Sequence, residues 1–184
     1  LAQYVLGEGG SKVAIAYDSR IKSTLFAREA ARVLAANGIK VYIYKELMPT
    51  PMLSYAVREL GCTSGIVVTA SHNPAKYNGY KAYGADGAQL SVENSQKVLD
   101  LVNKVDMFSS VRLCDFDEAV REGTIEYIGD ELIDKYLETV KSRSIEKVRG
   151  DLKVIYTPLN GTGNKPVREI LKRIGIENVT VVPE

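Results

Sequence analysis

One short segment gathers the side chains of this sequence that could do chemistry. Residues 69–81 read TASHNPAKYNGYK and follow the apolar run GIVV. Ser71 stands beside His72, the only histidine of the 184 residues, and Lys81 follows ten residues after the serine. A hydroxyl, an imidazole and an amine at this spacing suit covalent catalysis or proton transfer.

Three interpretations of the segment compete. Asn73-Pro74 and Asn78-Gly79 are strong turn formers, so the serine and histidine could be ordinary loop residues. A Ser–His hydrolase is disfavoured, because the sequence lacks a G-x-S-x-G elbow and because adjacent side chains of an extended segment point apart. The third interpretation is phosphoryl transfer through a phosphoserine, which needs cations and hydrogen-bond donors around the phosphate more than a dedicated imidazole.

Neighbouring residues supply such groups. Lys81 would bring positive charge and proton transfer, although a solvated strand lysine is the plainer alternative. His72 would hydrogen-bond a substrate or phosphate oxygen. Asn73 and Asn78 would bond through their side chains, while the backbone amides of the loop form an anion nest.

The elements that must position this loop are short strands alternating with helices. Buried apolar runs predict strands over 12–17, 40–44 and 65–69. Helices are expected over 23–38, from Pro51 onward, and over 91–104, 115–122 and 129–144. This alternation indicates βαβ crossovers and a three-layer α/β/α domain with a mostly parallel mixed sheet. The loop then lies at the carboxyl end of a strand, where ligands of open parallel sheets bind.

The first long helix carries an apolar stripe that predicts its buried face. The spacing favours burial of the residues Phe26, Ala30, Val33 and Leu34.

A second unit begins after a polar stretch. Residues 141–151 read as a linker, and a strand, a helix and a further strand follow up to 182. We therefore expect one domain over 1–145 and the beginning of a second, similar domain over 146–184.

The bulk composition narrows the function classes. Lys and Arg number 24 against 23 Asp and Glu, which argues against a protein that binds nucleic acid or a membrane surface. No apolar run approaches the roughly 20 residues of a membrane span. The two cysteines have no metal-like spacing, so a reduced, cytoplasmic protein is expected.

The serine loop and four other segments resemble the α-D-phosphohexomutase family of phosphoglucomutases and phosphomannomutases. The phosphoserine signature T-A-S-H-N-P is present at 69–74. Similar family segments occur at 16–20 with Ser23 (G-x-D-x-R-x-x-S), at 48–51 (P-T-P), at 157–163 (the second-domain opening) and at 83–90. The last of these is most similar to the bacterial phosphoglucomutase and phosphopentomutase subgroup.

The resemblance implies an isomerase that interconverts hexose 1-phosphate and hexose 6-phosphate, with glucose phosphates as the first choice. Ser71 would give its phosphate to the sugar, form bound glucose 1,6-bisphosphate and take the other phosphate back, while Mg²⁺ binds the phosphate on Ser71. Lys81 would do acid–base work and His72 would neighbour the phosphoserine. The substrate- or phosphate-binding residues would be Arg20, Asn73 and Asn78. For Arg20, a solvated arginine at a helix start is the alternative.

Several family segments are absent from the sequence, and alternatives therefore stay open. It has no D-G-D-x-D-R metal loop, no G-E-x-S-G sugar loop and no C-terminal phosphate loop. We expect a first domain with the start of a second, inactive by itself and taken from a four-domain enzyme. A phosphomannomutase, a phosphopentomutase and a catalytically silent phosphosugar-binding homologue are the alternatives.

Overall fold

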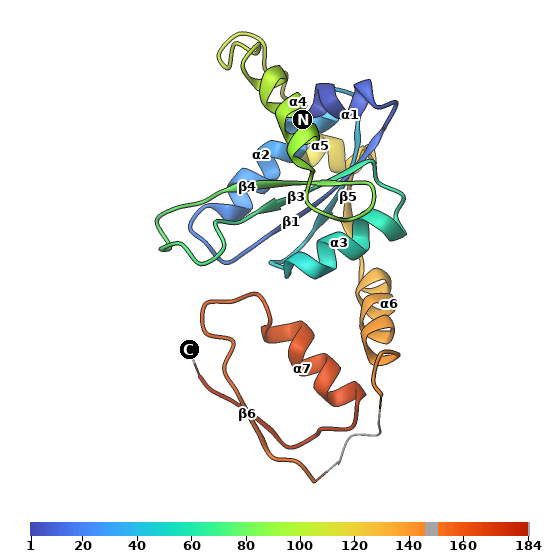
Figure 1. Ribbon diagram of the computed structural model, residues 1–184, viewed down its shortest axis with the longest axis vertical. Coiled ribbons are helices and arrows are strands. Elements are labelled where there is room, and N and C mark those ends of the chain that lie inside the picture. The colour runs from blue at the N-terminus through green and yellow to red at the C-terminus, as the bar shows by residue number, and fades with distance from the viewer. Residues whose placement is uncertain (146–150, 184) are drawn as a thin grey trace. The chain divides into compact units, whose positions relative to one another are not determined.

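A computed structural model describes residues 1–145 and 151–183. The chain divides into two compact units, Leu1–Ile128 and Gly129–Glu184. The first unit contains one five-stranded sheet and the second a two-stranded sheet (Figure 1). The predicted linker at 141–151 falls partly outside the described residues, and the domain boundary at 145/146 stays a prediction.

The sheet of the first unit is mixed and mostly parallel, as the sequence predicts. Its order is β4-β3-β1-β2-β5, and only the β3–β4 pair is antiparallel. The strands are β1 (Lys12–Tyr17), β2 (Lys40–Tyr44), β3 (Ser64–Val68), β4 (Tyr80–Gly84) and β5 (Ile125–Ile128). The edge strands β4 and β5 are not among the strands that the sequence predicts.

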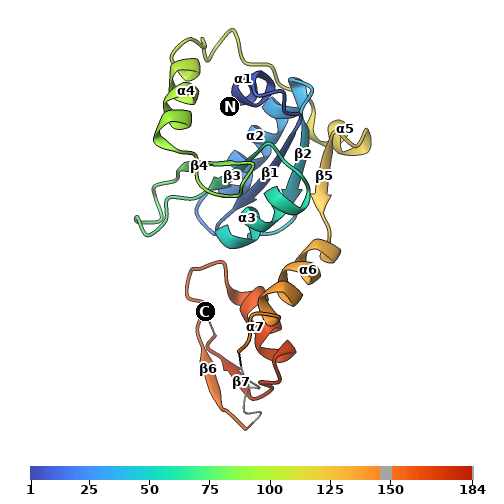
Figure 2. The same ribbon diagram turned by 45° about the vertical axis from the view of Figure 1, so that its right-hand side comes forward.

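Helices flank this sheet on both faces and complete the three layers. They are α1 (Ala2–Gly7), α2 (Ser23–Ala36), α3 (Thr50–Glu59), α4 (Val92–Val102) and α5 (Phe116–Arg121). Helix α3 covers one face of the strands and α2 the other (Figure 2). All residues of β1 after Lys12 are buried, as expected for a parallel strand covered on both sides.

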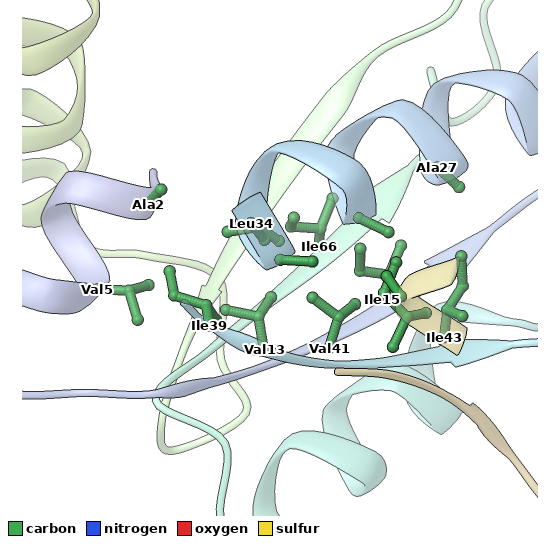
Figure 3. Packing of buried hydrophobic residues seen from close by; sticks show 14 of the residues in the cluster. Ala2, Val5, Val13, Ile15, Ala27, Leu34, Ile39, Val41, Ile43 and Ile66 are labelled. Carbon is green, nitrogen blue, oxygen red and sulfur yellow. The ribbon is translucent and has the colours of Figure 1, made fainter. Parts of the chain in front are cut away.

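The buried face of α2 differs from the prediction. Phe26 is 45% exposed, whereas Ala27 and Ala31 are fully buried. Figure 3 shows Ala27 and Leu34 on α2 in one buried cluster with strand residues such as Ile15. The buried stripe is therefore displaced by one position, because alanines let the helix backbone lie close to the sheet and the larger phenylalanine is left at the rim.

The second unit contains a βαβ unit preceded by a helix. Its elements are α6 (Asp130–Lys141), β6 (Val154–Tyr156), α7 (Asn164–Arg173) and β7 (Val179–Val181), with β6 and β7 parallel. Arg173 on α7 forms ion pairs with Asp134 and Glu138 on α6 and joins the two helices. Within the described residues, no helix is long and apolar enough to cross a membrane.

Candidate phosphoryl-transfer site

The serine loop, residues 69–79, connects β3 to β4 at the carboxyl edge of the sheet. Val68, the last residue of β3, pairs with Tyr17, the last residue of β1, in parallel register. Asp18 continues this contact, since its backbone N–H donates to the carbonyl of Val68 over 3.2 Å. The two strand ends thereby bring the segment after β1 and the serine loop together. Lys81 lies near the same edge of the sheet on β4, where it is the antiparallel strand partner of Val67 on β3.

Ser71 occupies an uncommon backbone conformation. Its φ of 57° lies in the left-handed region, which few residues other than glycine adopt. The backbone N–H of Ser71 donates to Oγ1 of Thr69 over 3.0 Å, and the N–H of Asn73 donates to the carbonyl of Ala70 over 3.1 Å. These bonds hold a tight turn that presents an exposed serine, and such strained positions cluster at functional sites.

His72 lies closer to the serine hydroxyl than the sequence suggests. Its Nδ1 is 3.4 Å from Oγ of Ser71. The expectation that the two side chains point apart is wrong, because it assumed an extended segment and Ser71 instead sits in a left-handed turn. The contact is nevertheless longer than the roughly 2.8 Å of a well-formed hydrogen bond to a hydroxyl. The imidazole therefore flanks the hydroxyl without a tight bond to it.

The side chain of Arg20 holds the serine loop by bonding to the backbone carbonyls of the loop. Its Nη1 donates to the carbonyls of Pro74 and Tyr77 over 2.9 and 3.1 Å, and its Nη2 donates to the carbonyl of Ser71. Nε pairs with Oδ2 of Asp18 over 3.1 Å. These contacts use four of the five side-chain N–H donors of the guanidinium. The Arg20 side chain is only 10% exposed, so it is packed against the loop and is not a solvated arginine.

The two asparagines of the loop have different surroundings. Both N–H donors of Asn78 are engaged, by Oγ of Ser23 over 2.9 Å and by the carbonyl of Ile21 over 3.3 Å. Its Oδ1 accepts from the N–H of Gly79 over 2.8 Å. Asn78 thus has no remaining side-chain donor for a phosphate in this conformation. Asn73, by contrast, is exposed on the loop.

Gly79 permits the loop to close on itself. Its carbonyl accepts from the N–H of Thr69 over 3.0 Å. A Cβ built on Gly79 would lie 2.5 Å from the Thr69 carbonyl oxygen, closer than packed atoms approach. Glycine is therefore the residue that fits here, and the two ends of the loop are tied together two residues before Ser71 and two residues before Lys81.

Lys81 and the acidic groups complete the site. The side chain of the half-buried Lys81 has no hydrogen bond or ion pair within residues 1–145 and 151–183. The Asp18 carboxylate is engaged by Arg20 and Ser23. In the same described ranges, no group of three or more His, Cys, Asp or Glu residues could hold a metal ion.

Comparison with known proteins identifies the family. Residues 1–108 match the family described as phosphoglucomutase/phosphomannomutase, alpha/beta/alpha domain I. The chain belongs to this family. The phosphoglucomutase of Staphylococcus saprophyticus is 38% identical over 100% of this chain and 34% of its own length. A probable phosphomannomutase of Haemophilus influenzae is 32% identical over 100% of this chain and 37% of its own length.

Solved structures of the phosphoglucomutase/phosphomannomutase family have the same fold. The crystal structure of a putative phosphomannomutase from Thermus thermophilus superimposes with a TM-score of 0.83 at 28% identity, over 98% of this chain and 39% of that one. The chain spans about a third of the length of the curated relatives that it matches. The three-layer fold expected from the sequence is confirmed.

Two residues of the site were not singled out for a role by the sequence. Ser23 and Thr69 donate to or accept from the groups that hold the loop. The spacing D-x-R-x-x-S at 18–23 contained the signal for Ser23, because it places a hydroxyl five residues after Asp18 and three residues after Arg20, at the start of α2. Its partner Asn78 lies 55 residues away in the sequence, and only the fold brings the two together.

Proposed function

We propose that this chain is the phosphoserine-carrying part of an isomerase that moves a phosphoryl group between the 1- and 6-positions of a hexose, most readily of glucose. The observation that carries the proposal is the geometry of Ser71. Its hydroxyl is exposed on a strained turn whose backbone carbonyls are bonded by Arg20. A rigid, exposed hydroxyl at the carboxyl edge of a parallel sheet suits a group that carries and returns a phosphate.

The proposed reaction uses this hydroxyl twice. In the first half, the bond between phosphorus and Oγ of phosphorylated Ser71 breaks, and a bond forms to the free hydroxyl oxygen of a hexose monophosphate. The proton of that hydroxyl ends on Oγ, and we assign its transfer to Lys81. The bound 1,6-bisphosphate then turns around, and Ser71 takes back the other phosphate by the reverse step.

Positive charge near the transferring group would stabilise the reaction. The guanidinium of Arg20 bonds three loop carbonyls, including that of Ser71, so its positive charge lies close to the serine. The imidazole of His72 lies beside Oγ and would bond a phosphate or sugar oxygen. Asn73, exposed on the loop, would bond the substrate. Fixed donors and charges of this kind are the main source of catalysis in phosphoryl transfer.

In the proposal, Mg²⁺ would bind the phosphate carried on Ser71. Asp18 is the carboxylate nearest the loop along the hydrogen-bond network, and both of its oxygens already accept hydrogen bonds. The phosphate on Ser71 would be one ligand, but the described residues do not form a metal site by themselves. We therefore assign no step to the metal. The proposed partners are a phosphosugar substrate and glucose 1,6-bisphosphate as activator and intermediate.

The test is a substitution in the complete protein that carries this chain. Ser71→Ala should lower conversion of glucose 1-phosphate to glucose 6-phosphate by several orders of magnitude, because the phosphate carrier is lost. Ser110→Ala, which changes an exposed serine of the same unit, is the control and should retain full turnover. Near-normal turnover by Ser71→Ala would remove the phosphoserine mechanism.

A further inference from the structure

A chain of hydrogen bonds runs beneath the serine loop from Asp18 to Gly79. The hydroxyl of Ser23 donates to Oδ1 of Asp18 over 2.8 Å and accepts from Nδ2 of Asn78 over 2.9 Å. Oδ1 of Asn78 in turn accepts from the N–H of Gly79 over 2.8 Å. Ser23 is 1% exposed, so its hydroxyl has no access to substrate and little to water.

Asp18 fixes the donor and acceptor of every hydrogen bond in this series. An ionised carboxylate can only accept, and its Oδ1 and Oδ2 already accept from the backbone N–H and Nε of Arg20. The hydroxyl of Ser23 must therefore donate its single proton to Asp18, and its oxygen accepts a hydrogen bond from Asn78. This forces the amide of Asn78 to point its nitrogen at Ser23 and its oxygen at Gly79. One buried hydroxyl thus sets the orientation of a side chain on another loop.

The hydrogen bonds from Asp18 to Gly79 also join the two halves of the serine loop. Asp18 holds Arg20, which bonds the carbonyl of Ser71 in the first half. The same carboxylate holds Ser23, which secures Asn78 at the end of the loop, three residues before Lys81. If the link through Ser23 is lost, the loop keeps the Thr69–Gly79 backbone bond, but Nδ2 of Asn78 is left with only the longer 3.3 Å bond to the carbonyl of Ile21, and the amide is no longer held in one orientation.

We propose that Ser23 is a positioning residue of the phosphoryl-transfer site, which acts through Asn78 to fix Lys81 relative to Ser71. This inference rests on the proposed function. Misplacement of a catalytic group by about 1 Å can cost on the order of 100-fold in rate. A positioning residue that never touches substrate should therefore lower kcat and leave KM nearly unchanged.

The experiment compares Ser23→Ala with Ser64→Ala in the complete protein. Ser64 is a matched control, because it is fully buried and lies at the end of β3 that is far from the serine loop. Its hydroxyl donates a single 2.7 Å bond to the carbonyl of Tyr83 on β4. Each variant loses buried hydrogen bonding, so both should lower Tm. Ser23→Ala should lower kcat by about 10- to 100-fold with KM changed less than about threefold. Ser64→Ala should keep kcat within about twofold.

A second pair of variants tests the link itself. Asn78→Ala should lower kcat about as much as Ser23→Ala, because both substitutions break the same series of hydrogen bonds. For the same reason, the double variant should be no slower than the slower single variant. Independent, multiplying losses would contradict the link, and so would a kcat of Ser23→Ala equal to that of Ser64→Ala. If Ser23→Ala does not fold, Asn78→Ala decides: an unchanged kcat overturns the inference. An active Ser71→Ala variant would instead overturn the proposed function.

Discussion

Replacing Arg20 by lysine should loosen the serine loop while keeping its positive charge. The guanidinium bonds three loop carbonyls, those of Ser71, Pro74 and Tyr77. A lysine ammonium has no planar fork and can reach at most one of these positions in place of the three. Two bonds from a charged donor are therefore lost, worth about 1 kcal/mol each after solvent screening at this surface loop.

The loss of about 2 kcal/mol corresponds to roughly 30-fold if it is expressed fully in the rate. We expect Arg20→Lys to lower kcat by about 10- to 30-fold in the complete protein. Trypsin supplies a second readout, since Lys76 is exposed within the loop and is followed by Tyr77. Cleavage after Lys76 should accelerate by a similar factor, because the protease needs an opened loop.

Arg28→Lys is the control for this prediction. Arg28 lies in the same unit and pairs with Asp117 over 3.3 Å on the surface. This change should alter neither turnover nor cleavage after Lys76, because the contacts of Arg28 within the described residues are with Asp117 and the ring of Phe116 and not with the serine loop. If Arg20→Lys matches the wild type in both readouts, the guanidinium does not hold the loop, and the reasoning from its contacts fails.

Three further predictions concern single positions. Lys81→Met should lower turnover by roughly 10²–10⁴-fold if the lysine moves the proton, and an unchanged rate and pH–rate profile would reduce Lys81 to a structural role. Gly79→Ala should lower both Tm and turnover, because its Cβ would lie 2.5 Å from the Thr69 carbonyl oxygen; a variant as stable and active as the wild type would show that the loop adjusts freely. Burial raises the pKa of the Cys62 thiol to about 12, so a thiol reagent at pH 8 should label the half-buried Cys114 first and Cys62 only on unfolding; equal labelling rates would contradict its burial.

The sequence predicts the strands that are buried on both faces. Strands β1, β2 and β3 are continuous β-branched or apolar runs, and this pattern depends on little else. The edge strands β4 (YKAYG) and β5 (IEYI) are short and partly exposed, so their composition does not separate them from loops. They become strands because β3 and β2 supply partners.

The sequence also predicts which segment carries the chemistry, but not how that segment is held. The pattern TASHNP identifies Ser71, and the fold places Lys81 on the strand that leaves the same loop. The contacts of Arg20 with loop carbonyls could not be predicted, because backbone carbonyls leave no trace in the sequence and lie 51 to 57 residues away. The left-handed backbone of Ser71 is hidden for a similar reason, since it follows from the closed loop and not from the residue type.

The central claim is that Ser71 exchanges phosphate with the sugar, and one measurement tests it directly. The complete protein is incubated with glucose 1,6-bisphosphate labelled in its phosphates, and the tryptic peptide 59–76 is analysed by fragmentation mass spectrometry. We predict label on Ser71 and not on Ser64 of the same peptide, and we predict that unlabelled glucose 1-phosphate removes it at the rate of turnover. Turnover of the sugar phosphate without label on Ser71 would contradict the account.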